Sequence, residues 1–307
     1  MPLSAPLPWP ALAAAQHRVV PRLRFDMLDD LGRPRTAGSV AVAHLDALAA
    51  WPQALRVTGD AVTLAVAPAG RQAFFAEANA ALHAQGLIVA WRDETYPVLA
   101  LPADGRSPDP QADLLATFER AASRFWGTAT FGAHCNGYVT DTGEANGRPT
   151  HLWIARRSDT KPTDPGLLDN LVGGGVPHGQ TPADTVIREG WEEAGLTPAQ
   201  MAGIRPGSIL RLGRDIPEGF QLEWLSVYDL ALPPGLQPCN QDGEVQALHC
   251  WPVDEALARA AAGEMTTDAT LATLDFALRH GLLAGADAAR CAALLDSLAH
   301  GPASLAR

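Results

Sequence analysis

The sequence predicts a mixed α/β or α+β fold built in two parts. The chain has 307 residues, a length typical of two domains, and 47% of them are hydrophobic, which is enough for a sizeable core. A loop rich in Pro, Asp and Gly at 101–113 separates an N-terminal run of short strands and helices from a second run of strands, one embedded helix and further helices. We therefore expect a smaller α+β domain at 1–112 and a larger domain at 113–307.

The elements of the N-terminal part follow from periodicity and turn residues. β-branched, aromatic and alternating positions predict its strands, and the helix ending before Gly86 has a glycine stop. The predicted elements are strands at 22–28, 61–67 and 94–101, helices at 43–51 and 71–85, and a connecting helix at 113–127. No catalytic constellation occurs in this part.

The second part begins with strand-like segments joined by a turn-rich stretch at 142–149, which favours a hairpin. Alternating residues predict two more strands further on, and the last 55 or so residues are helical in pattern. The predicted elements are strands at 131–139, 151–158, 220–232 and 243–251 and, among the C-terminal helices, one at 268–280.

Charge and cysteine usage limit the class of protein. The formal net charge is −11, from 34 acidic and 23 basic residues, and this argues against a nucleic-acid or anionic-membrane binder, which needs a basic face. Four cysteines without CxxC spacing predict free thiols in a reducing compartment, so we expect a cytoplasmic protein. No apolar stretch has the ~18 residues of a membrane span, and the N-terminus lacks the basic leader of a signal peptide.

The segment 173–196 carries the chemistry. Thr181 is a good N-cap, Pro182 suits the first helical position, Asp184 belongs in the first turn and Gly195 is a C-terminal stop, so the segment predicts a helix over 182–194. Its apolar and small residues form one stripe, which we expect to be buried: Ala183, Val186, Ile187, Gly190 and Ala194.

Glu189, Glu192 and Glu193 lie on the opposite side of this helix, at spacings of three and four. Like charges at that spacing repel, and a divalent cation would reverse the repulsion, which favours Mg²⁺ or Mn²⁺. The alternative is an ordinary solvated acidic face. The glycines at 173–175 and Gly179 predict a loop with close backbone approach and positive φ before the helix.

These residues resemble the Nudix box, G-x5-E-x7-R-E-U-x-E-E-x-G-U, where U is bulky and aliphatic. Gly174, Arg188 and the three glutamates occupy box positions, followed by Gly195 and Leu196. Gln180 stands where the box has its first glutamate, and Gly190 where it has a bulky apolar residue. Gly190 costs the helix about 1 kcal/mol relative to Ala but permits close packing on the buried stripe.

The resemblance implies a Nudix-fold α/β/α sandwich with a mixed sheet and Mg²⁺- or Mn²⁺-dependent hydrolysis of a diphosphate. It extends over roughly 20–285, and the segments that carry it look similar to a Nudix subgroup related to thiamin pyrophosphokinase, in which an N-terminal domain of unknown function precedes the hydrolase domain. Members are implicated in removing damaged thiamin diphosphate. The segments are 91–98, 131–139, 152–175 and 228–245.

Site roles are assigned from the box outward. Glu189, Glu192 and Glu193 are the predicted metal ligands and catalytic residues, and Arg188 is predicted to orient a glutamate. Glu244 is the predicted further ligand or base from outside the box, ahead of Asp242 and Glu223. Gly174 and a basic cluster are the predicted cofactor and phosphate contacts, the cluster being Arg156, Arg157 and Lys161, the chain's only lysine.

Other polar and aromatic residues near the box favour structural roles as much as functional ones. His178 is most simply a loop histidine, and His134 and Asn136 are as consistent with a buried structural role as with a pocket. The tryptophans 153, 191 and 224 are expected in the core.

Three functions remain open. The first is hydrolysis of a small organic diphosphate, such as thiamin diphosphate or its damaged derivatives, to the monophosphate and phosphate. The second is a nucleoside diphosphate-X pyrophosphatase acting on a nucleotide sugar or ADP-ribose, and the third a weakly active Nudix-fold binding module. A small-molecule diphosphate is the expected partner, without nucleic acid or membrane, and a homodimer is compatible with the resemblance.

Overall fold

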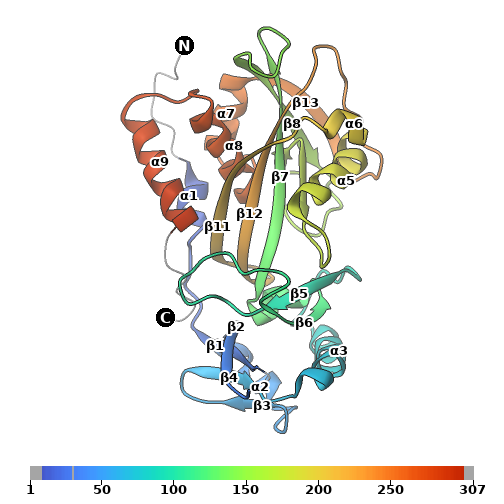
Figure 1. The fold of residues 1–307 in the computed structure, drawn as a ribbon, viewed down its shortest axis with the longest axis vertical. Helices are drawn as coiled ribbons and strands as arrows, with labels where there is room; N and C mark the ends of the chain where they lie inside the picture. The colour runs from blue at the N-terminus through green and yellow to red at the C-terminus, as the bar shows by residue number, and fades with distance from the viewer. Residues whose placement is uncertain (1–8, 30, 301–307) are drawn as a thin grey trace.

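The computed structural model describes residues 9–29 and 31–300. Figure 1 shows a small body with the first four strands at one end and a larger body built on a long sheet at the other, with the β5–β6 pair between them. None of the helices in the described part of the chain has the length and apolar character that a membrane span requires. All four cysteines are free, as expected, and Cys135 and Cys291 are buried.

The small body is a four-stranded sheet with the order β2-β1-β4-β3, in which β1 and β4 are parallel and the other pairs antiparallel. Its helix α3 buries Phe74, Phe75 and Leu82 against that sheet. Its elements are β1 (Arg22–Leu28), β2 (Pro34–Ala41), the 3₁₀ turn η1 (Val42–His44), α2 (Leu45–Leu48), β3 (Leu55–Val57), β4 (Ala61–Leu64) and α3 (Pro68–Ala84). The strands and helices predicted here are confirmed, while β2 and β3 were not predicted.

The single helix predicted over 113–127 is wrong. The chain there forms β6 (Leu114–Glu119), which pairs antiparallel with β5 (Thr95–Leu99), and then the short helix α4 (Ala122–Trp126). Pairing with β5 overrides the helical propensity of this alanine-containing segment, because Phe118 and Trp126 thereby enter the N-terminal core, where the Trp126 ring lies 4.7 Å from Phe25. The domain boundary at 112/113 stays a prediction, but residues 118–126 pack with the part before it.

The larger body is a seven-stranded mixed sheet. Its main order is β11-β12-β7-β8-β13, with β10 paired to β7 and β9 to β8; the central β12–β7 pair is parallel and the others are antiparallel. The predicted β7–β8 hairpin is confirmed. The strands are β7 (Ala129–Thr140), β8 (Pro149–Arg157), β9 (Leu168–Asn170), β10 (Val172–Gly175), β11 (Arg205–Ile216), β12 (Gly219–Ala231) and β13 (Val245–Pro252).

Helices cover both faces of this sheet (Figure 1), which confirms the expected α/β/α sandwich. One face carries α5 (Pro182–Ala194) and α6 (Pro198–Met201), and the other carries α1 (Pro10–Ala14), α7 (Val253–Ala261), α8 (Thr267–Arg279) and α9 (Gly285–His300). Residues 269–277 of α8 are buried on all sides, because this helix lies between the sheet and the outer helices.

A charged cluster at one end of α8 fixes this helix to the sheet. Asp229 of β12 is 3% exposed and accepts hydrogen bonds from Arg279, at 2.9 Å to Nη2, and from His280, at 3.0 Å. Burial alone would raise the pKa of Asp229, but the hydrogen bonds and charges of Arg279 and His280 outweigh it and hold the pKa below its usual value. The ionised carboxylate therefore stabilises the fold.

We expect Asp229→Asn to lower the free energy of unfolding by about 1–3 kcal/mol at pH 7, because it removes the carboxylate that Arg279 shares with His280 and leaves Asp275 as the remaining partner of Arg279 among the described residues. A carboxyl whose folded pKa is depressed contributes stability above its unfolded pKa, about 3.9, and loses it as the pH falls further. The deficit of the variant should therefore shrink between pH 5 and pH 3 in urea titrations. A constant deficit at both pH values, or an equal one in the exposed Asp46→Asn control, would contradict the electrostatic assignment.

Gly190 is the point where α5 and α6 touch. A Cβ there would lie 2.8 Å from both Cε and Sδ of Met201, so the glycine admits the Met201 side chain. This confirms the expectation that Gly190 permits close packing on the buried stripe.

Gly190→Leu, which introduces the side-chain type that the box has at this position, should overpack the α5–α6 contact. We expect the free energy of unfolding to fall by about 1–3 kcal/mol. Adding Met201→Ala should recover most of the loss, because the vacated space admits the leucine. A double variant no more stable than the single one in denaturant titrations would rule out this contact as the reason for Gly190.

Candidate functional site

Helix α5 begins and ends where its local sequence predicts. The Thr181 side chain accepts from the Asp184 amide at 3.2 Å and the Asp184 carboxylate accepts from the Thr181 amide at 3.2 Å, which completes a capping box. Gly195 ends the helix with a left-handed φ of 64°.

The residues 173–175 form strand β10 rather than the predicted loop, and none of them has a positive φ; only Gly179, nearer the helix, does. What the strand needs is the absence of side chains. A Cβ on Gly174 would lie 2.4 Å from a carboxylate oxygen of Glu189, and one on Gly175 would lie 2.0 Å from the Tyr96 hydroxyl. The glycines therefore let side chains from α5 and β5 reach the backbone of β10.

The three glutamates do not lie on a solvated face. Glu193, predicted opposite the buried stripe, is 4% exposed, and its Oε2 accepts a hydrogen bond from the Gly173 amide at 2.9 Å. Glu189 is largely buried beside Gly174 and Glu192 is partly exposed. Burial of Glu193 was missed because β10 lies beside α5, a tertiary contact that helical periodicity does not report.

Lys161 joins Glu193 to Glu244. Its Nζ lies 3.4 Å from Glu193 Oε1 and forms a short ion pair with Glu244 Oε2. The chain's only lysine is thus 9% exposed and is held between an α5 carboxylate and the predicted residue from outside the box. Of the two other carboxylates considered, Asp242 accepts a hydrogen bond from the Glu244 amide, and Glu223 pairs with Arg124 and lines the cavity described below.

Burial and mutual repulsion weaken the acidity of the two carboxylates nearest β10. Burial raises the pKa of Glu189 to about 7; Arg188 opposes the rise, and Glu192 and Glu244 add to it. Burial raises the pKa of Glu193 to about 8, against the charge of Lys161 and with a contribution from Glu189. Negative charge at this position is therefore under-compensated by the protein alone.

Arg188 contacts two of the glutamates, as its predicted role requires. It donates to Glu189 at 2.7 Å and to Glu192 at 2.6 Å, while its Nε lies 3.5 Å from the Gln180 side-chain oxygen. Gln180 thus supplies an acceptor where the box has a glutamate, without the charge.

The donor chemistry of these residues fits a hard divalent cation. The three side chains Glu189, Glu192 and Glu193 offer only carboxylate oxygens. Burial, and after it the neighbouring carboxylates, raise the pKa values of Glu189 and Glu193, and a cation would favour their ionised forms. Within 9–29 and 31–300, no three Asp, Glu, His or Cys side chains converge closely enough to hold an ion as they stand, and Arg188 and Lys161 are paired with the carboxylates. Binding would require these ion pairs to exchange.

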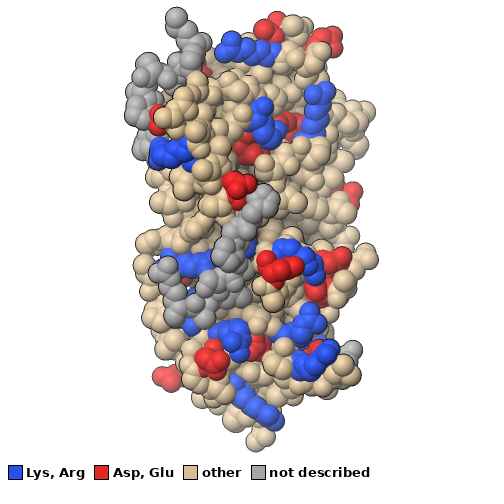
Figure 2. Space-filling view, turned by 60° about the vertical axis from the view of Figure 1, so that its left-hand side comes forward, with Lys and Arg blue, Asp and Glu red and all other residues tan. Residues whose placement is uncertain are grey.

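A cavity of about 530 Å³ adjoins the glycine strand. Residues 173–175 form part of its wall together with His134, Asp169 and Arg157, and its other walls come from 89–124, 214–223 and the start of α8. This volume is in the range of small-molecule sites. The residues that line it include both acidic and basic side chains. On the face of the molecule drawn in Figure 2, acidic and basic residues are likewise interspersed.

The basic cluster predicted beside the box is divided in three. Arg157 lines the cavity and donates to Asp169 at 2.8 Å, whereas Arg156 points to the other side of β8 and lies near Asp159 at the surface. Lys161 lies between the glutamates, as described. Only Arg157 of the three is therefore in direct reach of a ligand in this cavity.

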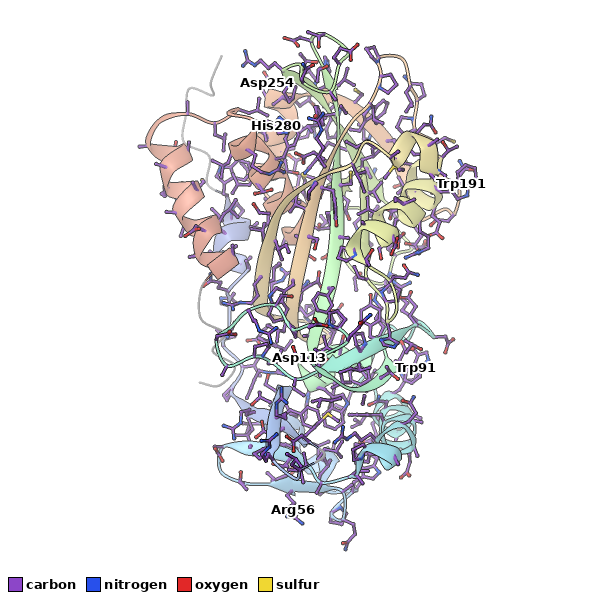
Figure 3. The ribbon with its side chains drawn as sticks, in the orientation of Figure 1. Arg56, Trp91, Asp113, Trp191, Asp254 and His280 are labelled. Carbon is purple, nitrogen blue, oxygen red and sulfur yellow. The ribbon has the colours of Figure 1, made fainter. Side chains whose placement is uncertain are left out.

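The remaining residues considered from sequence have mixed outcomes. His134 lines the cavity and hydrogen-bonds Asn170 at 2.8 Å, Asn136 is buried in a polar network with Asn170, and His178 lines a second, apolar cavity of about 200 Å³ with Trp224. Trp153 and Trp224 are core residues as expected, but Trp191 is 50% exposed and points outward from α5 in Figure 3.

Several cavity residues were not predicted, because they come from the N-terminal part or from strands with no motif. They are Arg92, Tyr96, Arg120, Arg124, Asp169 and Arg214. The available signals were two segments that carry the resemblance to the subgroup: 91–98 contains Arg92 and Tyr96, and 152–175 contains Asp169.

Because Lys161 is the only lysine, protein labelled with ¹⁵N-lysine should give one side-chain ammonium signal in NMR spectra. We expect Mg²⁺ or Mn²⁺ to shift or broaden that signal, because a cation at Glu193 competes with Lys161 for the carboxylate. In Glu193→Gln the response should be lost. An unchanged lysine signal at saturating metal would place the ion elsewhere.

Comparison with known proteins shows which proteins this part of the chain is similar to. Residues 138–269 match the NUDIX domain family. The chain is 36% identical over 201 residues to Nudix hydrolase 20, chloroplastic, of Arabidopsis thaliana, covering 65% of this chain and 50% of the relative. It is 35% identical over 201 residues to Nudix hydrolase 24, chloroplastic, of the same plant, covering 65% and 51%.

The chain thus spans about half the length of the curated relatives it matches. Among solved structures, protein DR0079 of Deinococcus radiodurans is similar at 22% identity with a TM-score of 0.43, over 60% of this chain and 99% of that one. A score this low adds nothing to the layer arrangement described above. The family match contains the whole of β10 and α5 with their glutamates, so this part of the chain is similar to the NUDIX domain family.

Proposed function

We propose that the protein is a divalent-metal-dependent Nudix hydrolase that cleaves a small organic diphosphate to the monophosphate and phosphate. The observation that carries the proposal is the approach of the Glu189 and Glu193 carboxylates to the side-chain-free backbone of β10, at the wall of a cavity of about 530 Å³. Carboxylates that repel one another beside a ligand-sized cavity are an arrangement suited to binding a cation that in turn binds phosphate.

Glu189, Glu192 and Glu193 would hold Mg²⁺ or Mn²⁺, which neutralises phosphate charge and lowers the pKa of water. The chain's own residues do the positioning: Arg188 orients Glu189 and Glu192, and the Gly173 amide orients Glu193. Arg157, in the cavity wall, contacts phosphate oxygens.

In the proposed reaction, water adds to one phosphorus atom and the bridging P–O bond breaks, so the bridging oxygen leaves with the other phosphate. The proton of the water passes to a carboxylate, for which Glu244, held by Lys161 beside Glu193, is the candidate. Nothing covalent between protein and substrate is needed.

For the organic group, thiamin diphosphate and its damaged derivatives are the proposed class. The support is the resemblance of 91–98 and of the segments around the box to the subgroup related to thiamin pyrophosphokinase, together with a cavity of suitable size. A cytoplasmic location and a homodimer remain predictions.

A hydrolysis screen with Mg²⁺ and Mn²⁺ tests this function. The panel contains thiamin diphosphate, its oxidised analogues, nucleotide sugars, ADP-ribose and dinucleotides. Inorganic phosphate plus an organic monophosphate is the expected outcome. Nucleoside monophosphate plus a sugar phosphate would instead establish the nucleoside diphosphate-X reaction, and ligand-induced rises in melting temperature without turnover would indicate a binding module.

With the substrate so found, Glu193→Gln should lower kcat by at least two orders of magnitude and Glu192→Gln by a comparable factor, because each removes a charge from the cation site. Chelation by EDTA should abolish turnover, and added Mg²⁺ or Mn²⁺ should restore it. Glu144→Gln, at an exposed loop position, is the matched control and should retain full activity. Full activity in both helix variants would show the site assignment to be wrong.

A further inference from the structure

The cavity at the glycine strand is completed by the N-terminal part of the chain. Val89, Ala90 and Arg92 precede β5, yet they line the same cavity as 173–175. Two contacts hold this segment against the Nudix domain: the His178 amide donates to the Thr95 carbonyl at 2.9 Å, and the Tyr96 hydroxyl lies over Gly175. The N-terminal part is therefore in a position to contact a ligand.

Arg92 differs from the other arginines of the cavity. Arg120 pairs with Glu94 at 3.0 Å, Arg124 with Glu223 at 3.2 Å and Arg157 with Asp169 at 2.8 Å. Arg214 lies 3.9 Å from Asp268 and donates to Thr267 and Gln221. The Arg92 guanidinium forms neither an ion pair within 4.0 Å nor a hydrogen bond with any residue that the structure describes.

The loop that carries Arg92 is strained and anchored. Ala90 and Asp93, on either side of it, have positive φ values of 59° and 58°, an unfavourable conformation for residues other than glycine. The Arg92 amide donates to Glu119 of β6 at 2.9 Å, and the Trp91 indole donates to Asp93 at 2.8 Å. Such a backbone persists only where its surroundings hold it, so these contacts fix the backbone position from which the Arg92 side chain extends.

The charge of Arg92 also acts on Glu244, the candidate base. Burial alone would raise the pKa of Glu244, but Lys161 lowers it below its ordinary value, and the charge of Arg92 adds to that effect. Glu244 in turn is bridged to Glu193 by Lys161. A phosphate in the cavity beside 173–175 would meet this guanidinium, which has no carboxylate partner in the part of the chain that the structure describes.

We propose that Arg92 is a phosphate-binding residue of the active site, supplied by the N-terminal part, and that it contacts the diphosphate of the substrate from the part of the cavity wall that precedes β5. The inference rests on the proposed function, since it assigns a residue to the same site. The Arg92 guanidinium offers two parallel N–H donors to phosphate oxygens, whereas a lysine at this position would act only as a point charge.

The experiment compares Arg92→Gln with Arg56→Gln, which removes the same charge from the exposed strand β3 at the far end of the small body (Figure 3). Two readouts are used: steady-state kinetics on whichever diphosphate the screen identifies, and calorimetric binding of methylenediphosphonate, a non-hydrolysable diphosphate, with Mg²⁺. We expect Arg92→Gln to raise KM and the dissociation constant about tenfold or more, with Arg92→Lys intermediate and Arg56→Gln like the wild type.

The experiment distinguishes a failure of the Arg92 inference from a failure of the proposed function. If the wild type hydrolyses a diphosphate and Arg92→Gln leaves both KM and methylenediphosphonate affinity unchanged, the Arg92 inference is wrong and the function stands. If the wild type hydrolyses nothing in the screen, the proposed function fails, and methylenediphosphonate binding alone decides about Arg92. Equal weakening in Arg56→Gln, absent binding by the wild type, or a fall in melting temperature that accounts for the Arg92→Gln effect would each overturn the inference.

Discussion

Strand β10 carries no side chain over residues 173–175, and the site depends on that absence. Backbone without Cβ atoms admits the Glu189 carboxylate on Gly174 and the Tyr96 hydroxyl on Gly175, and it leaves the Gly173 amide free to bind Glu193. Three elements distant in sequence, β5, α5 and β7, therefore meet on four residues of one strand. A side chain here would collide with His134 at position 173, with the Glu189 carboxylate at 174 and with Tyr96 at 175.

The second constraint is electrostatic. Burying the Glu193 carboxylate costs free energy unless a positive charge lies near it. Lys161 is shared between Glu193 and Glu244, and Arg188 is shared between Glu189 and Glu192. Despite this sharing, burial raises the pKa values of Glu189 and Glu193, and the neighbouring carboxylates add to the rise. The net charge of −11 thus argues against binding phosphate by a basic surface, but it is compatible with carboxylates that bind phosphate through a cation.

What the sequence predicted well is what local interactions determine. Helix α5 runs over the predicted residues because its capping box, first-turn proline and glycine stop lie within it or next to it. The burial of Glu193, the exposure of Trp191 and the strand at 114–119 depend on which elements become neighbours, and neither periodicity nor propensity reports that. For the same reason the glycines looked like a loop: a strand formed by pairing with β7 has no sequence signature when it carries no side chains.

The strained backbone of the loop around Arg92 indicates a role for the N-terminal part. Positive φ at Ala90 and Asp93 is unfavourable, and no turn between paired strands requires it there. The loop is held by the hydrogen bond of the Arg92 amide to Glu119 and by the Trp91–Asp93 hydrogen bond. All of these residues precede the residues 138–269 that match the NUDIX domain family, so these contacts do not involve that domain. The loop is held by its own contacts, borders the cavity and presents a guanidinium without a partner among the described residues. A ligand explains this combination better than packing does. On this argument the two parts of the chain form one site, and separating them would remove a wall of the cavity.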